Sequence, residues 1–337
     1  MPALSGPDAQ PPPASGMVRR FAPTRIDAAL AAQISAALES NHILYFPRCP
    51  VALPDEATLQ LLRTQLPAQL RRKNISYYPE QRRLSGLKAG VDRRLYEQTM
   101  AVLQQHLGAV QSFLPQVLPG LCNGRAPGKC SLRPIQERGR NLPAHASNER
   151  VHVDAGACGV TNGDRILRFF VNINPQEDRV WASKGTIQQL LQRHGRAAGL
   201  LDASGRLRVR VEKGAADHLR SFAVQCLVRL NERAAALDSS PYDRAMRRLH
   251  NYMKDSDHYR ADEAGYEEIR FPPGSAWMVF TDGVTHASLS GQFALVTTVL
   301  VPRSALQYPQ FAPYHLLAAH TAGGPGFPSA GSPALPD

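Results

Sequence analysis

The chain has 337 residues, 43% of them hydrophobic, and a formal net charge of +11 at pH 7. This length and composition allow one large domain with a sizeable core. The excess of cations favours anionic partners such as nucleic acid, anionic lipid or acidic small molecules, and it is equally compatible with a solvated basic surface. Five scattered cysteines without a C-x-x-C pair argue against a zinc knuckle or a disulfide framework and favour a reducing compartment.

The ends of the chain differ from its body. Residues 1–18 and 319–337 are rich in Pro, Ala, Gly and Ser without periodicity, which predicts disordered tails around a single domain at 19–318. No apolar run reaches the roughly 18 residues of a transmembrane helix. The N-terminal segment also lacks the apolar core of a signal peptide. We therefore expect a cytoplasmic protein.

The first part of the body, residues 19–129, is predicted to be mainly helical. Apolar residues recur at helical spacing in three runs, at 26–38, 57–66 and 96–114. Pro67 should end the second of these helices. A short strand, HILYFP, is expected at 42–47.

The pattern then changes to short runs rich in Val, Ile and Phe, which predict strands. They fall at 130–182 and again at 266–303, on either side of a mostly helical stretch at 186–258. The two β-rich parts must meet in space to complete one sheet system. We predict an α+β fold in which a double-stranded β-helix, or jelly roll, carries a helical N-terminal region and a helical insertion.

One short motif in the β-rich part suggests a metal site. His152 and Asp154 form an H-x-D pair in the strand-like run RVHVDA, so both side chains should point to the same face. His286 lies between two β-like runs and is the best candidate for a third ligand. Two histidines and one carboxylate leave open coordination positions, which suits non-haem iron(II). H-x-D alone is a weak signal, but its strand-like flanks and the placement of His286 strengthen it.

An iron site of this kind commonly takes 2-oxoglutarate, whose distal carboxylate then needs a cation inside the barrel. Many such enzymes place an Arg about ten residues after the distal His, where this chain has Val296, Thr297 and Thr298. The cation must therefore come from another strand. Arg168, in the run RILRFFVNINP, is the first candidate. The residues predicted to bind 2-oxoglutarate are Arg168, Asn172, Asn174 and Thr298, with Arg133 and Arg303 as alternative cations.

Longer segments carry a resemblance to a known family, and they run in order from about residue 42 to residue 317. The segments are HILYFP (42–47), RRKNISYYP (71–79), SLRPIQERGR (131–140), RVHVDA (150–155), RILRFFVNINP (165–175), SPYDRAMRRLHNYMKDSDHYR (240–260), FPPGSAWMVFTDGVTHASLSGQFAL (271–295) and PQFAPYHLL (309–317). Together they resemble the Kdo 3-hydroxylases, which act on 3-deoxy-D-manno-oct-2-ulosonic acid (Kdo) in lipopolysaccharide. The chain departs from the family pattern at 156–164 and 296–298, beside the proposed ligands in sequence.

The resemblance implies an iron(II)- and 2-oxoglutarate-dependent hydroxylase with a cupin-like fold, supported by ascorbate, that converts Kdo to Ko. By this resemblance His152, Asp154 and His286 are both the metal ligands and the catalytic residues. The substrate would be a Kdo sugar linked to lipid A, so basic residues should line the mouth of the site. The candidates for this role are Arg133, Arg138, Arg140 and Lys73.

The same interpretation implies peripheral attachment to the inner face of the inner membrane and no nucleic-acid partner. Two other classes of protein stay open from the residues alone. One is a cupin-like 2-oxoglutarate oxygenase for another substrate, such as a protein side chain. The other is a non-catalytic cupin that binds an anionic sugar. Release of succinate with and without a candidate substrate would separate the three.

Overall fold

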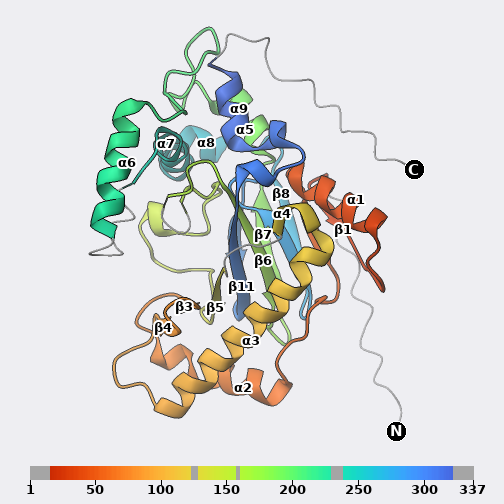
Figure 1. Ribbon diagram of the computed structural model, residues 1–337. Helices are drawn as coiled ribbons and strands as arrows, with labels where there is room; N and C mark the ends of the chain where they lie inside the picture. Colours follow the sequence, from red (N-terminus) through yellow and green to blue (C-terminus); the bar gives the residue numbers. More distant parts are fainter. Residues whose placement is uncertain (1–15, 123–127, 157–159, 229–237, 322–337) are drawn as a thin grey trace.

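The computed structural model describes residues 16–122, 128–156, 160–228 and 238–321, with the side chains of 225–228 left out (Figure 1). Most of both predicted tails therefore lies outside the described residues. The part of the N-terminal tail that is described includes a short strand, β1 (Val18–Arg20). None of the helices in the described ranges has the length and hydropathy needed to cross a bilayer.

Three helices form within the N-terminal region. They are α1 (Ala28–Glu39), α2 (Glu56–Gln65) and α3 (Arg93–Val117). Each follows an aspartate whose side chain accepts a hydrogen bond from the backbone N–H three residues later, namely Asp27, Asp55 and Asp92. Such capping satisfies a donor that the first helical turn leaves free. The three predicted helices are thus confirmed, with α2 followed at once by a short 3₁₀ helix at Pro67–Gln69.

The large sheet has eight strands in the order β1-β2-β9-β6-β11-β5-β3-β4. Its remaining strands are β2 (Ile43–Phe46), β3 (Ile75–Tyr78), β4 (Arg83–Ser85), β5 (Lys129–Arg133), β6 (Arg165–Asn172), β9 (Ala276–Phe280) and β11 (Ala294–Val301). All neighbours pair antiparallel except β1 with β2. The N-terminal region is therefore less purely helical than predicted. Three of its four strands, β1, β3 and β4, are too short to leave a clear alternating pattern.

A smaller antiparallel sheet has the order β10-β7-β8. Its strands are β7 (Arg179–Ser183), β8 (Glu267–Phe271) and β10 (Ala287–Ser290). An aromatic cluster from both sheets fills the space between them: Phe170 lies against Trp181 and Trp277 with ring centroids 4.9 and 5.0 Å apart. The alternate residue Phe169 packs on the opposite face of β6, against Phe113 of α3. Alternation along β6 therefore directs one set of side chains to the space between the sheets and the other to the helices.

The region between β7 and β8 is largely helical, as predicted. It contains α5 (Ile187–His194), α6 (Ala215–Val228), α7 (Pro241–Asp255) and α8 (Asp257–Ala261). A short helix after β11, α9 (Pro313–Ala319), packs with α5, α7 and α8 around a core that includes Val153. The remaining short helices are α4 (Pro119–Cys122), Ala144–Ala146, Arg303–Ala305 and Pro309–Phe311. The mixed fold with one large, mainly antiparallel sheet agrees with the predicted α+β class.

Candidate metal centre

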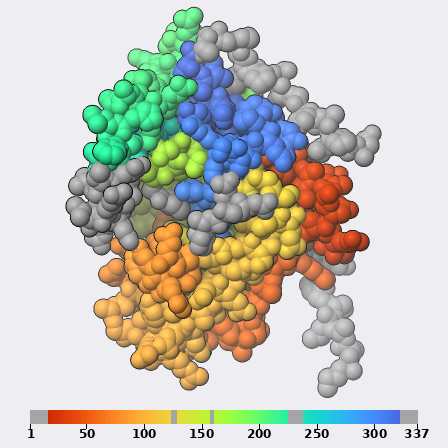
Figure 2. All heavy atoms as spheres, in the orientation of Figure 1, coloured from red at the N-terminus to blue at the C-terminus, as the bar shows by residue number. Residues whose placement is uncertain are grey.

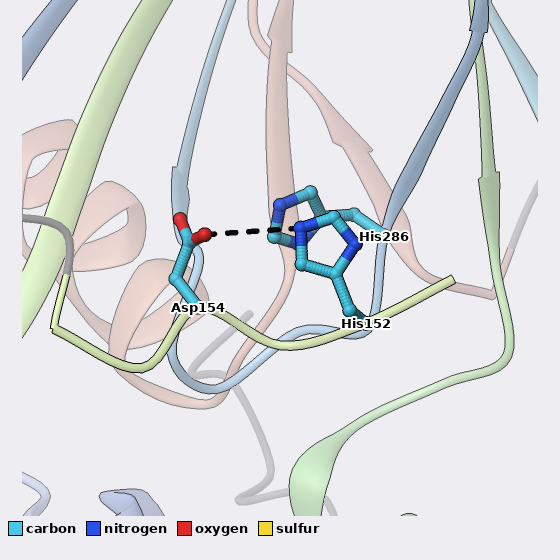
Figure 3. A group of neighbouring side chains, drawn as sticks. All are labelled: His152, Asp154 and His286. Carbon is cyan, nitrogen blue, oxygen red and sulfur yellow. Dashed lines mark ion pairs between the residues drawn. The ribbon is translucent and has the colours of Figure 1, made fainter. Parts of the chain in front are cut away.

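The structure brings His152, Asp154 and His286 together, beside Trp181 of the aromatic cluster between the sheets. One potential ligand atom from each residue lies within 4.8 Å of the other two. In Figure 3 both imidazole rings and the carboxylate converge on one region, although His286 belongs to a different part of the chain. In this cluster the carboxylate Oδ1 of Asp154 lies 3.8 Å from Nε2 of His152. Bonds from a metal ion to nitrogen or oxygen are about 2 Å long, so a cluster of this size can surround one ion.

The segment that carries His152 and Asp154 does not form the regular strand that was predicted. It pairs with the rest of the protein through an isolated antiparallel bridge between His152 and His286. The backbone N–H of Asp154 donates to the carbonyl of Thr281 at 2.8 Å. These bonds keep the segment extended, so the i and i+2 side chains still project together.

The imidazole groups are oriented by the backbone. Nδ1 of His152 lies 2.7 Å from the carbonyl oxygen of Arg150, and Nδ1 of His286 lies 3.0 Å from that of Val284. A carbonyl can only accept, so each Nδ1 carries the proton and each Nε2 keeps a free lone pair. This arrangement is the usual one for histidines that bind a metal.

His286 is further fixed by its surroundings. Its ring stacks on Trp181, with centroids 5.2 Å apart. The turn before it is anchored by Asp282, whose carboxylate pairs with Arg165 at 2.7 Å; both side chains are almost completely buried. Arg165 therefore supports the loop that carries a candidate ligand.

Asp154 also has a cationic partner, Arg168. Nη2 of Arg168 lies 3.0 Å from Oδ2 of Asp154. Burial alone would raise the pKa of Asp154, but Arg168, His286 and His152 together hold it well below its usual range. Burial lowers the pKa of His286 to about 4. The site therefore offers an ionised carboxylate and neutral imidazoles near pH 7, which are the protonation states that bind a metal.

A second group of charges centres on Glu137, which is 3% exposed. Its carboxylate pairs with Arg179 at 3.1 Å, Arg140 at 3.4 Å and Arg133 at 3.8 Å. Burial opposes ionisation of Glu137, yet Arg133 and Arg179 lower its pKa. Burial, and then repulsion from Arg179 and Arg168, lower the pKa of Arg133 to about 9. The arginines in this region thus exceed the carboxylates that the described residues offer them.

Three of these arginines, Arg133, Arg168 and Arg179, retain a buried Nε–H. These Nε atoms have no hydrogen-bond partner within the described protein. A buried N–H without an acceptor is costly, by roughly 1–3 kcal/mol. An anion bound between the guanidinium groups of Arg133 and Arg168 would supply acceptors to those two.

The other residues predicted to bind 2-oxoglutarate fall in different places. Thr298 is buried and pairs across the sheet with Arg168. The amide of Asn172 donates to two backbone carbonyls and accepts from the N–H of Asn174, whose own oxygen caps a turn. Both amides already serve the backbone after β6, so we do not retain them as contacts of a cosubstrate. The alternative cation Arg303 lies over the ring of Tyr314, 3.9 Å from its centroid.

The predicted substrate-binding cations separate into two sets. Arg133 and Arg140 contact Glu137. Lys73 belongs to the same group of charges: burial of its amino group, and then repulsion from Arg133, lower its pKa. Arg138 instead lines a different hollow of about 500 Å³, beside Arg270. We do not retain Arg138 as a substrate contact at the metal centre.

The sequence analysis missed several residues around this centre. Glu137 stands in the quoted segment SLRPIQERGR, and Trp181 lies in the stretch 130–182 that was predicted to be rich in strands. No local pattern indicates that Glu137 neutralises arginines or that Trp181 stacks on a ligand. Helix α7 contributes two more: the ring of His250 lies edge-on to His152 with centroids 5.1 Å apart. Lys254, 2% exposed, donates to the carbonyl of Ser147. Both come from the insertion, far from H-x-D in sequence.

Fold and site together define a class: a mixed protein with two facing sheets and a two-histidine, one-carboxylate cluster of the kind that holds non-haem iron(II). Comparison with known proteins narrows this class. The sequence model of the 3-deoxy-D-manno-oct-2-ulosonic acid (Kdo) hydroxylases matches residues 23–323. The chain belongs to this family. A search of curated proteins found no match.

Solved structures of the Kdo hydroxylase KdoO, described as a non-haem Fe(II) α-ketoglutarate-dependent dioxygenase, resemble the chain over most of its length. The apo structure has 27% sequence identity and a TM-score of 0.72, covering 90% of this chain and 95% of KdoO. A complex of KdoO with α-ketoglutarate and Fe(III) has 26% identity and a TM-score of 0.70, with the same coverage. A cobalt(II) complex has 26% identity and a TM-score of 0.71, covering 94% of this chain and 98% of KdoO.

Proposed function

We propose that this chain is an Fe(II)- and 2-oxoglutarate-dependent dioxygenase that hydroxylates Kdo, giving Ko, in the inner core of lipopolysaccharide. The observation that carries the proposal is the cluster of His152, Asp154 and His286, with both Nδ1 atoms occupied by backbone carbonyls. It occurs in a chain matched along most of its length by the Kdo hydroxylase family. We also infer that the facing sheets form the double-stranded β-helix expected from the sequence.

The donor set fits iron(II). Nε2 of His152, Nε2 of His286 and a carboxylate oxygen of Asp154 would hold the ion. When bound, iron(II) and 2-oxoglutarate supply O₂ activation, with succinate and CO₂ as coproducts. The chain's own task is to orient these groups and exclude water, and the buried aromatic cluster beside His286 suits that task.

For the cosubstrate, we propose that Arg168 binds the distal carboxylate of 2-oxoglutarate and that Arg133 assists. Both side chains project into the space between the sheets, and each retains a buried, unpartnered Nε. Thr298 faces Arg168 across the strand pair and could bond the same anion. A dianionic cosubstrate would offset the excess of arginines around Asp154 and Glu137.

For the substrate, we propose that the carboxylate of Kdo is attracted by cations around the metal centre. Arg133, Arg140 and Lys73 form one electrostatic group there. Lys254 belongs beside it, because burial and then repulsion from Lys73 lower the pKa of Lys254 to about 8. Ascorbate, which can keep iron reduced, is proposed as the supporting reductant.

We further propose that the protein binds the cytoplasmic face of the inner membrane while it acts on a lipid-linked sugar, and that it does not act on nucleic acid. The net charge of +11 supports attraction to anionic lipid. Helix α6 adds an apolar contact: Leu219 and Phe222, one turn apart, are 72% and 66% exposed. Both α6 and the residues just before it lie at the outer edge of the molecule (Figure 2). The helix is thus accessible to a flat surface.

A direct assay tests the activity. The purified protein, given Fe(II), 2-oxoglutarate and ascorbate, should release succinate in the presence of Kdo-linked lipid A and much less in its absence. Succinate release that depends instead on a peptide substrate would indicate that the chain hydroxylates protein side chains. Absence of succinate with any substrate, despite metal binding, would favour a binding protein.

A further inference from the structure

Helix α7 of the insertion contacts the segment that carries the candidate ligands. Nδ1 of His250 lies 2.7 Å from the carbonyl oxygen of Val153, the residue between His152 and Asp154. One turn later, Lys254 donates from Nζ to the carbonyl of Ser147. The spacing of four residues places both side chains on the same face of the helix.

The first turn of α7 is hydrogen-bonded to Thr161, which follows the two candidate ligands in the chain. A carboxylate oxygen of Asp243 accepts hydrogen bonds from the backbone N–H of Thr161 at 2.9 Å and from its hydroxyl at 3.0 Å. In the return direction, Arg150 donates to the backbone carbonyl of Lys254. The helix is therefore bonded to the loop before, between and after the two ligands.

These contacts matter because the segment receives little support from the sheets. Its described backbone joins them only through the bridge of His152 with His286, the bond from Asp154 to Thr281 and the bond from Ser288 to Asn148. A two-histidine, one-carboxylate site requires the ligand atoms to be placed within about 0.5 Å. Side-chain bonds from α7 supply the restraint that a regular strand would otherwise give.

We propose that His250 is a positioning residue of the metal centre. By donating from Nδ1 to the Val153 carbonyl, and by packing edge-on against the ring of His152 at 5.1 Å, it fixes the orientation of both ligands that flank Val153. The carbonyl can only accept, so Nδ1 of His250 carries the proton. This proposal rests on the proposed function, since it presumes that His152 and Asp154 bind a metal.

Three substitutions at one position test it. In His250→Asn the side-chain amide N–H takes the place of Nδ1–H. In His250→Gln the donor lies one bond farther out, and in His250→Ala it is absent. Arg247→Ala, an exposed position on the same helix, is the matched control. The readout is binding of Co(II) alone to the full-length apoprotein, by calorimetry and by the visible spectrum of the bound ion.

Partners of a metal ligand are worth about 10–100-fold in metal affinity. We therefore expect His250→Ala and His250→Gln to weaken Co(II) binding by about that factor and to alter the spectrum, while His250→Asn and Arg247→Ala stay close to wild type. Equal affinity and an unchanged spectrum in His250→Gln would overturn the proposal, even if His250→Ala fails to fold. So would a loss in His250→Asn as large as in His250→Gln, because the donor would then not be the feature that matters. Failure of the wild type to bind Co(II) would instead count against the proposed function.

Discussion

The backbones of His152 and His286 are joined by two reciprocal hydrogen bonds. The N–H of His152 donates to the carbonyl of His286 at 3.0 Å, and the N–H of His286 donates back at 2.8 Å. Because this bridge is made by main-chain atoms, the distance between the ligands does not depend on their side chains. Substitution of a ligand side chain should therefore remove function without removing the fold.

The first prediction concerns Asp154. Asp154→Asn keeps the size of the side chain but removes the charge, and Asp154→Ala removes both. We expect each to lower succinate release by at least about a hundredfold, since a lost charge-assisted ligand costs roughly 3 kcal/mol. Circular dichroism should show a folded protein. Asp154→Ala should unfold at a lower temperature, because Arg168 loses the carboxylate 3.0 Å away. Turnover near that of wild type in either variant would contradict the assignment.

The second prediction concerns the cosubstrate. Arg168→Ala should raise the apparent KM for 2-oxoglutarate by about a hundredfold, because a buried charge-assisted pair contributes roughly 3 kcal/mol. Because Arg168 also pairs with the ligand Asp154 at 3.0 Å, iron binding should weaken as well, so KM is measured with Fe(II) at saturation. Arg303→Ala is the matched control, since this residue lies over Tyr314 instead. If KM stays unchanged in Arg168→Ala and rises in Arg133→Ala, the distal carboxylate binds Arg133.

The third prediction concerns a histidine that has no role in the proposed metal centre. His106 of α3 is 1% exposed with no hydrogen-bond partner for either nitrogen. Burial lowers its pKa to about 4. The unfolded chain, with a histidine pKa near 6.5, therefore binds this proton first as pH falls. The free energy of unfolding therefore falls as the pH is lowered from about 6.5 to about 4. Between pH 7 and pH 5 the loss due to His106 is about 2 kcal/mol.

His106→Leu removes that titration while keeping an apolar contact with Phe169. Urea unfolding of the metal-free protein at pH 7 and pH 5 measures the effect. The variant should lose about 2 kcal/mol less free energy of unfolding between the two pH values than the wild type does. Parallel pH dependences would show that His106 is protonated in the folded state or does not control this loss.

The fourth prediction concerns the membrane. Binding to vesicles with anionic lipid should weaken as salt rises, since the Debye length falls to about 3 Å at 1 M. Leu219→Ser combined with Phe222→Ser should weaken binding at every salt concentration, because it removes the exposed apolar contact of α6. Tyr266→Ser, another exposed position, is the control. Vesicle binding that changes neither with salt concentration nor with the α6 substitutions would contradict peripheral docking through α6.

The sequence predicted those parts of the fold that have long periodic patterns. The helices around 26–38, 57–66 and 96–114 form, as do the strands on either side of the insertion. The short strands β3 and β4 gave no pattern because they contain too few alternations, whereas β2, which is as short as β3, was indicated by its apolar run ILYF. The run around His152 looked like a strand by composition, yet the structure gives it one bridge, to His286, and two further backbone bonds, with Thr281 and Ser288. Side chains of α7 supply further bonds to it.

The ligand set could be proposed from local spacing, because H-x-D needs only alternation to place two side chains together. The role of His286 needed the strand context on both sides. By contrast, the network of Glu137 with its arginines joins segments far apart in the chain. For Asn172 and Asn174, alternation gives the face of the residue but not that its amide already bonds the backbone.

The central claim is tested most directly by mass spectrometry of the product. Purified protein is incubated with Fe(II), 2-oxoglutarate, ascorbate, O₂ and Kdo-linked lipid A, with Asp154→Asn as the control. The account predicts that the lipid gains one oxygen atom on the Kdo sugar, in step with one succinate released, and that the control gives neither. An unmodified lipid from a protein that binds iron and 2-oxoglutarate would contradict it.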